Sequence, residues 1–126
     1  MTPKEIANAY IEWLAKGEIE KIIALFSADG QVHSPVYGVQ SAKDFYEQLA
    51  EDSNSSVLQL KGIFEEKRNN RLAIYFNYKW TLRNGTFVDF DVVDILELNK
   101  KNQITSLKII YDTVQSRVLV EGLNAS

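Results

Sequence analysis

Two long apolar runs that meet at Arg83-Asn84-Gly85 constrain the fold of this chain more than any other feature. Both runs, which together span residues 71–98, are rich in aromatic and β-branched residues, and Asn-Gly is typical of a β-hairpin turn. A two-residue turn would set the polar face of one strand against the apolar face of the other. A three-residue loop with Gly85 in the left-handed conformation shifts the pairing by one residue and removes this conflict, so we predict the longer loop.

The predicted register gathers the apolar side chains of the hairpin on one face. They are Ile74, Phe76, Tyr78, Trp80, Val88, Phe90, Val92, Leu96 and Leu98. The opposite face pairs Lys79 with Asp89 and Asn77 with Asp91, which are favourable polar pairs across neighbouring strands. Asp94 is the one carboxylate on the apolar face. Because burying an unpaired carboxylate is costly, we expect the function to involve Asp94.

The composition is that of an ordinary globular protein and argues against several kinds of partner. The 126 residues are 45% hydrophobic and 25% charged, with a net charge of -3. We therefore expect a single domain over residues 1–126, with a core from about residue 5 to 113 and a C-terminal tail. Mixed charges without a basic patch predict neither a nucleic-acid nor a membrane partner. The chain has no cysteine, and without a signal-peptide core or a long apolar span we expect a cytoplasmic location.

Three helices are predicted in the first half of the chain. Thr2 and Glu5 are spaced as a capping box around a helix that Gly17 ends. A second helix is expected over residues 18–26, and Ser41 is the expected N-cap of a third. The inner stripe of this third helix consists of Ala42, Phe45, Tyr46 and Leu49.

The remaining segments predict an antiparallel sheet. Besides the hairpin, we expect strands over residues 31–34, 57–67 and 104–111, the second with a bulge at Gly62. Residues 27–30, 36–40 and 52–56 are expected to be connections, and the tail over residues 112–126 shows no clear period. Helices that are segregated from such a sheet indicate an α+β fold. We expect three N-terminal helices packed on a strongly curved, mostly antiparallel sheet, with the apolar hairpin face lining a conical cavity.

Four segments carry a family resemblance through their order and spacing. The first segment consists of residues 9–18 (AYIEWLAKGE) and 23–30 (IALFSADG), and the second is Val32-His33-Ser34-Pro35. The third consists of Gly38, Ala42 and Phe45, and the fourth of residues 109–113 (IIYDT). They resemble the nuclear-transport-factor-2-like (NTF2-like) superfamily, in particular its SnoaL-like and ketosteroid-isomerase-like branch. The resemblance covers about residues 5–113 and implies a cone-shaped, cystatin-like fold.

The isomerase resemblance implies roles for Tyr10 and Asp94. Those enzymes hold a substrate oxygen between a first-helix tyrosine and a protonated aspartic acid on a central strand, and these two residues match that pair. The family's general base is an aspartate just before the proline, where this chain has Ser34, whose hydroxyl cannot abstract a carbon-bound proton unaided. His33 and Asp112 are the candidate replacement bases, although strand alternation turns both away from the cavity.

Two other chemistries have less support in the sequence. Limonene epoxide hydrolases, which this chain also resembles, use an Asp-Arg-Asp constellation, and only Asp94 has a counterpart because Val92 and Ile109 occupy the other positions. An epoxide hydrolase is therefore disfavoured. A metal site is not expected either, because Asp89 and Asp91 lie on the opposite face from Asp94. We expect no cofactor.

The predicted ligand is a small, largely apolar molecule with one carbonyl or hydroxyl oxygen. Besides Tyr10 and Asp94, the expected lining is Ser34, Phe76, Tyr78, Trp80, Phe90, Leu107, Ile109 and Tyr111. Two functions remain open. One is an isomerase or polyketide-cyclase-like enzyme with His33 or Asp112 as the base, and the other is a non-catalytic ligand-binding or dimerisation module without turnover. For Asp94 itself, the alternative to a ligand-binding role is a buried aspartate whose hydrogen bonds are satisfied by a backbone N–H or by Tyr10.

The outer face of the predicted sheet also has many apolar side chains. They are Tyr75, Phe87, Val93, Ile95 and Ile110. An open sheet face of this kind usually packs against another surface, and the family resemblance implies a second copy of the chain. We therefore expect a homodimer through the sheets.

Overall fold

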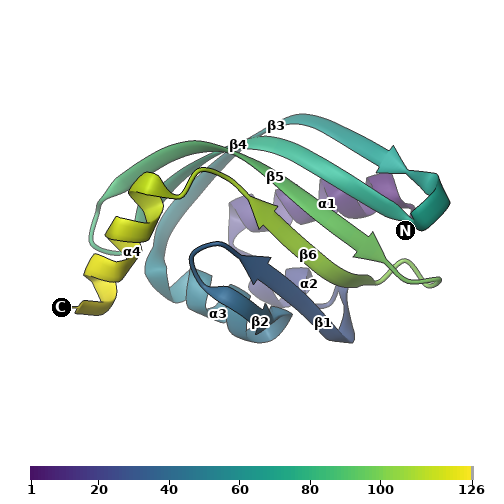
Figure 1. Cartoon of the computed structure of the whole chain (residues 1–126), viewed down its shortest axis with the longest axis horizontal. Coiled ribbons are helices and arrows are strands. Elements are labelled where there is room, and N and C mark those ends of the chain that lie inside the picture. The colour runs from purple at the N-terminus through teal and green to yellow at the C-terminus, as the bar shows by residue number, and fades with distance from the viewer. Residues whose placement is uncertain (126) are drawn as a thin grey trace.

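The computed structural model describes residues 1–125, so Ser126, the last residue of the predicted domain, lies outside the described residues. The helices are α1 (Pro3–Lys16), α2 (Ile19–Ile23), α3 (Ala42–Asp52) and α4 (Val114–Ala125), with a 3-10 turn, η1 (Lys67–Asn69). The strands are β1 (Phe26–Ser34), β2 (Gly38–Ser41), β3 (Ser53–Glu66), β4 (Arg71–Leu82), β5 (Phe87–Leu98) and β6 (Ile104–Ile110). Figure 1 shows the sheet arching over α1, α2 and α3, with α4 at one end of the arch.

One curved sheet contains all six strands, in the order β2-β1-β6-β5-β4-β3. The β1–β6 pair is parallel, and every other pair of neighbouring strands is antiparallel. Helices on the concave face of a mostly antiparallel sheet confirm the predicted α+β class. None of the helices in the described part of the chain has the length and apolar character that crossing a bilayer requires.

The hairpin has the predicted register. Trp80 pairs with Val88, and Ile74 pairs with Asp94. The loop consists of three residues: the Leu82 amide donates to the Thr86 carbonyl at 2.8 Å, and Gly85 has a φ of +87°. Since a left-handed φ favours glycine, the Asn-Gly signal fixes the register of β4 and β5.

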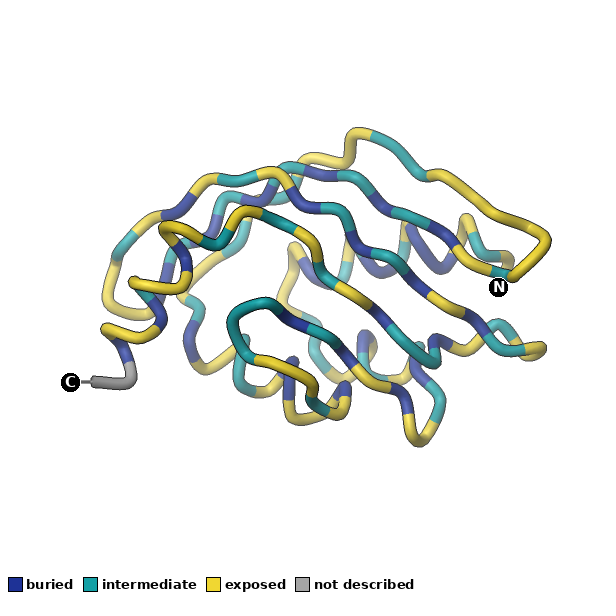
Figure 2. Tube along the Cα trace, in the orientation of Figure 1, coloured by how far each residue is buried: buried dark blue, intermediate teal, exposed yellow. Residues whose placement is uncertain are grey.

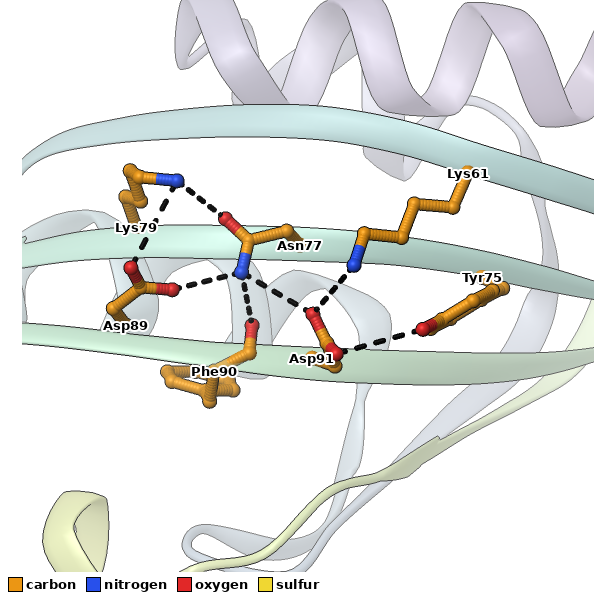
Figure 3. Close-up of polar contacts among 7 residues, drawn as sticks. All are labelled: Lys61, Tyr75, Asn77, Lys79, Asp89, Phe90 and Asp91. Carbon is orange, nitrogen blue, oxygen red and sulfur yellow. Dashed lines mark hydrogen bonds and ion pairs between the residues drawn. The ribbon is translucent and has the colours of Figure 1, made fainter.

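The burial of β4 and β5 follows from this register. After the exposed Arg71, residues of β4 are alternately buried and half-buried, as the colours of the trace in Figure 2 show, and the concave side of the sheet faces the helices. On the convex side, Asn77 donates to Asp89 at 2.7 Å and to Asp91 at 3.2 Å, while the Lys79 ammonium lies 3.8 Å from the Asp89 carboxylate (Figure 3). The predicted polar pairs across the strands are therefore present.

The capping predictions for α1 and α3 are confirmed. The Thr2 hydroxyl accepts from the Glu5 amide, the Glu5 carboxylate accepts from the Thr2 amide, and Gly17 ends α1 with a φ of +70°. The Ser41 hydroxyl accepts from the Asp44 amide at 3.1 Å at the start of α3. These caps satisfy amides that have no partner within the helix.

The region between α2 and α3 differs from the prediction. The second helix ends at Ile23 rather than at residue 26, residues 27–30 belong to β1, and β2 occupies part of the predicted loop. Gly30 is required inside β1 because a Cβ there would lie 2.8 Å from the Ile104 carbonyl oxygen. The glycine that suggests a break therefore permits close pairing with the neighbouring strand.

The start of β3 was also predicted too late. The strand begins at Ser53, directly after α3, so residues 53–56 are part of the sheet rather than a connection. Ser56 pairs with Trp80 on β4. Backbone pairing with β4 overrides the weak strand preference of these polar residues. The predicted irregularity at Gly62 is confirmed by a register shift between Leu60 and Gly62.

The C-terminal tail forms a helix that the sequence pattern does not predict. Val120 and Leu123 of α4 are buried against the core. The Arg83 guanidinium donates to the Leu123 carbonyl at 3.1 Å, and the Arg117 guanidinium donates to the Pro35 carbonyl. The inward-facing positions of α4 are also helically spaced, so an apolar stripe and the two guanidinium bonds together hold the helix in place; these positions are Ser116, Leu119, Val120 and Leu123.

Candidate functional site

A small cavity lies under the concave face of the sheet, between the sheet and the helices α1 and α3. Its volume is about 50 Å³, which is room for roughly three or four water molecules. The polar residues of the lining are Tyr10, Ser34, Tyr37 and Asp94, and the others are Leu14, Phe45, Leu49, Phe76, Tyr78, Trp80, Phe90, Val92, Ile109 and Tyr111. Since pockets for drug-sized ligands measure roughly 300–1,000 Å³, a larger ligand requires side chains to move.

Asp94 has its carboxyl group in this apolar wall. It is 1% exposed and pairs with Ile74 on one side and Ile109 on the other. Among the described residues, its Oδ1 atom has no hydrogen-bond partner. Burial raises the pKa of Asp94 to about 8, and the neighbouring Tyr10 hydroxyl offsets part of this rise. The carboxyl group is therefore predominantly protonated at neutral pH and carries an O–H that can donate a hydrogen bond.

Tyr10 reaches the same region from α1 and is held by a second tyrosine. Its hydroxyl lies 2.7 Å from the Tyr46 hydroxyl, and both side chains are buried. Burial raises the pKa of each tyrosine far above its usual value, and electrostatic interaction with Asp94 raises both pKa values further. Both phenols therefore remain protonated and can serve as neutral hydrogen-bond donors.

Tyr46 is a candidate functional residue that the sequence analysis missed. Its position on the inner stripe of α3 was interpreted as core packing, although a tyrosine on an apolar stripe needs a partner for its hydroxyl. Tyr46 does not line the cavity and instead contacts Tyr10 from behind. No spacing rule links the two residues, because they come together only through the packing of α1 on α3.

Most of the predicted lining residues do surround the cavity. Ser34, Phe76, Tyr78, Trp80, Phe90, Ile109 and Tyr111 all line it. Leu107 does not, because it is fully buried deeper in the fold, where it pairs with Val32 and Leu96. Leu107 and Ile109 share a face of β6 as expected, but the core side chains of β1 and β5 already fill the space beside Leu107. The Ser34 hydroxyl accepts from the amides of Val36 and Tyr37.

The two candidate bases lie outside the cavity. His33 is half-buried and pairs with Val39 and Lys108, on the opposite side of β1 from Ser34. Asp112 is exposed, and its Oδ1 accepts from the Val114 amide at 3.1 Å, at the start of α4. Among the described residues that line the cavity, Asp94 alone has a carboxyl, imidazole or amine group.

An ion pair between a buried carboxylate and an exposed guanidinium lies near the cavity and was not predicted. Asp52 is fully buried, its Oδ2 accepts from the Tyr37 hydroxyl at 2.7 Å, and its Oδ1 lies 3.0 Å from the Arg83 guanidinium. Burial and the bond to Asp52 raise the pKa of Tyr37. Because Arg83 also binds the Leu123 carbonyl, this network connects α4 to the wall of the cavity. Asp52 gave no sequence signal, since it stands in a polar stretch at the end of a helix.

Comparisons with known proteins identify the fold. No protein-family model and no curated protein matches the sequence. A protein with a ketosteroid isomerase-like fold from Catenulispora acidiphila DSM 44928 is 17% identical, with a TM-score of 0.77 over 95% of this chain and 92% of that chain. An NTF2-like protein of unknown function from Burkholderia pseudomallei K96243 is 13% identical, with a TM-score of 0.79 over 93% and 95% of the two chains.

A third similar structure has a described activity. SalBIII, an epoxide hydrolase/cyclase-like enzyme in pyran ring formation in polyether salinomycin, is 15% identical, with a TM-score of 0.75 over 86% of this chain and 89% of that chain. The chain therefore has the NTF2-like fold, which confirms the predicted resemblance at the level of the fold. Because one fold supports many unrelated activities, the function has to be argued from the site.

Proposed function

We propose that this protein binds a small, largely apolar molecule through one carbonyl or hydroxyl oxygen. The observation that carries the proposal is the buried Asp94 carboxyl group, whose Oδ1 has no partner among the described residues and whose neighbours on the adjacent strands are Ile74 and Ile109. An unsatisfied buried polar atom is uncommon and costly, and a ligand oxygen beside it removes that cost. Tyr10 supplies the second donor to the same oxygen.

The positions of the candidate bases decide whether a reaction that begins with proton removal is possible in this cavity. Isomerisation of the ketosteroid type begins when a base removes a proton from carbon. Neither His33 nor Asp112 lines the cavity, so a base-initiated reaction has no residue to start it in the described structure. A binding protein without turnover is therefore the leading proposal.

Proton donation to oxygen is the second candidate function. A carboxyl group with a pKa of about 8 is a competent general acid at neutral pH. In an apolar hydroxy-epoxide, Asp94 would protonate the epoxide oxygen as its C–O bond breaks, the ligand's own hydroxyl would close the ring, and the proton it releases would return to Asp94. The similarity to SalBIII, a protein described with pyran ring formation, favours testing this reaction class.

Binding of 4-ethylphenol tests the leading proposal. We expect Tyr10→Phe to weaken binding about tenfold, because one hydrogen bond to the phenol oxygen is lost. Tyr75→Phe removes the same hydroxyl from the outer face of the sheet and is the matched control, with unchanged affinity expected. Absence of wild-type binding at millimolar concentration, in titration calorimetry, would contradict the proposal. Incubation with a hydroxy-epoxide, comparing wild type with Asp94→Asn, then tests for turnover.

We also propose that two copies of the chain associate through the convex face of the sheet. Phe87 is 55% exposed and Ile110 is 48% exposed on this face, and Val93 and Ile95 are half-buried on it. Four apolar side chains together on one face of the sheet support a protein–protein interface there. The isologous contact of a two-fold dimer needs only this one surface.

A further inference from the structure

The cavity has a thin wall on the side of α1 and α3. On the other side of that wall lies an open groove of about 350 Å³. Leu14, Leu49 and Tyr78 line both the cavity and the groove, so the two spaces adjoin at these three side chains. The remaining groove residues are Ala15, Lys16, Gly17, Ile19, Ala50, Ser53, Asn54, Ser55 and Ser56.

Two of the three separating side chains are suited to movement. Leu14 and Leu49 stand on different helices and are unbranched at Cβ, so changes of χ1 are open to them. Leu49 is only half-buried, and Leu14 is 8% exposed. Tyr78 is held more firmly, because its hydroxyl bonds to the Ser56 hydroxyl at 2.8 Å and its ring packs on Phe90. Rotation of the two leucines would therefore join the spaces while Tyr78 remains in place.

The chemistry of the groove differs from that of the cavity. Its rim consists of the hydroxyl and amide side chains of residues 53–56, and Asn54 and Ser55 are exposed to solvent. Lys16 is the one charged side chain of the groove, and its ammonium is paired with Glu12 at 2.8 Å. The rim therefore favours a neutral group that donates and accepts hydrogen bonds, rather than a strongly charged one.

We infer that the groove is the entrance of the cavity and the second half of an extended binding site, an inference that rests on the proposed function. The ligand class is an elongated molecule whose apolar end places one oxygen beside Tyr10 and Asp94. Its other end is neutral and hydroxylated, and lies along residues 53–56. The cavity alone, at about 50 Å³, is smaller than ordinary ligand pockets, which measure roughly 300–1,000 Å³. The cavity and the groove together fall within that range.

The test is stopped-flow binding of two phenols to the full chain with a Trp13→Phe substitution, so that Trp80 in the cavity wall reports binding. The short probe is 4-ethylphenol and the long probe is 4-(6-hydroxyhexyl)phenol. Ala50→Phe fills the groove from α3, and Ala15→Phe fills it from α1; both alanines are exposed groove residues, and phenylalanine adds no second tryptophan signal. Glu51→Phe, at the adjacent exposed residue outside the groove, is the matched control.

We expect the groove-filling variants to slow association of both phenols about tenfold or more and to abolish the tighter binding of the long probe. Leu49→Ala should speed association of both phenols, and Glu51→Phe should leave both association rates unchanged. If 4-ethylphenol binds but its association rate is the same in all variants, the groove is not the entrance and the inference fails while the proposed function stands. If 4-ethylphenol does not bind to the wild type, both fail.

Discussion

The phenolic oxygens of Tyr10 and Tyr46 lie 2.7 Å apart, although 36 positions separate the residues in the chain. This contact couples α1 to α3 behind the cavity and orients the hydroxyl that stands nearest to Asp94. A tyrosine hydroxyl has one proton to donate. If Tyr46 donates to Tyr10, the Tyr10 proton is free to donate to a ligand, whereas if Tyr10 donates to Tyr46, it is not. Tyr46 therefore has the position of a residue that acts through Tyr10 without touching the ligand.

The role of Tyr46 predicts a non-additive pair of substitutions. We expect Tyr46→Phe to weaken binding of 4-ethylphenol severalfold in the wild-type background, because Tyr10 loses its orienting partner. In the Tyr10→Phe background the same substitution should have little further effect. Titration calorimetry on the four proteins measures the coupling, and equal losses in both backgrounds would contradict the positioning role.

The raised pKa of Asp94 predicts how stability changes with pH. The folded pKa of about 8 lies above the value of about 4 expected for the unfolded chain, so the folded state binds the proton more tightly. As pH rises from about 4 to 8, the unfolded state ionises first, and stability falls by about 1.4 kcal/mol per pH unit from this group. Above about pH 8 the loss levels off.

Asp94→Asn isolates this effect, because asparagine is similar in size and does not ionise. We expect the variant to be close to the wild type in free energy of unfolding at pH 4 and more stable by several kcal/mol, on the order of 5, at pH 9. Urea unfolding at a series of pH values provides the measurement. A stability difference that stays constant across this range would show that Asp94 does not titrate as the structure requires.

We expect the Asp52–Arg83 ion pair to stabilise the docked position of α4. Arg83→Ala leaves a fully buried carboxylate without its cation and removes the donor to the Leu123 carbonyl, so we expect a loss of about 2 kcal/mol. Hydrogen exchange should accelerate along α4 more than in the sheet. Arg71→Ala, which breaks an exposed pair with Glu66, is the control with an expected loss below about 1 kcal/mol. If the two substitutions lowered the free energy of unfolding equally, Arg83 would not be important for the docking of α4.

The proposed dimer predicts the effect of a charge on the convex face. We expect the wild type to sediment as a dimer at micromolar concentration and Ile110→Glu to sediment as a monomer, because a carboxylate would have to be desolvated at the interface. Val118→Glu introduces the same charge at an exposed position of α4 and should leave the dimer intact. A monomeric wild type in sedimentation velocity would contradict the proposal.

The sequence predicted those features that depend on local chemistry. The Asn84-Gly85 loop fixed the hairpin register, and this register placed Asp94 in the cavity wall, since alternation along a strand is a strict geometric rule. Tyr46 and Asp52 were missed for the opposite reason, because their partners come from distant segments and no spacing rule describes the packing of α1 on α3. The helix α4 was missed because its helically spaced inner face includes the polar Ser116, while the apolar Val114 and Val118 point to solvent and obscure the period.

Titration of the Asp94 side chain by carbon-13 NMR, with Asp94→Asn used to assign its carboxyl signal, tests the central claim most directly. The structure predicts a midpoint near pH 8, because burial in an apolar wall disfavours the charged form. A midpoint near pH 4, the value of a free aspartate, would mean that the carboxyl group is charged at neutral pH and has no proton to donate to a ligand.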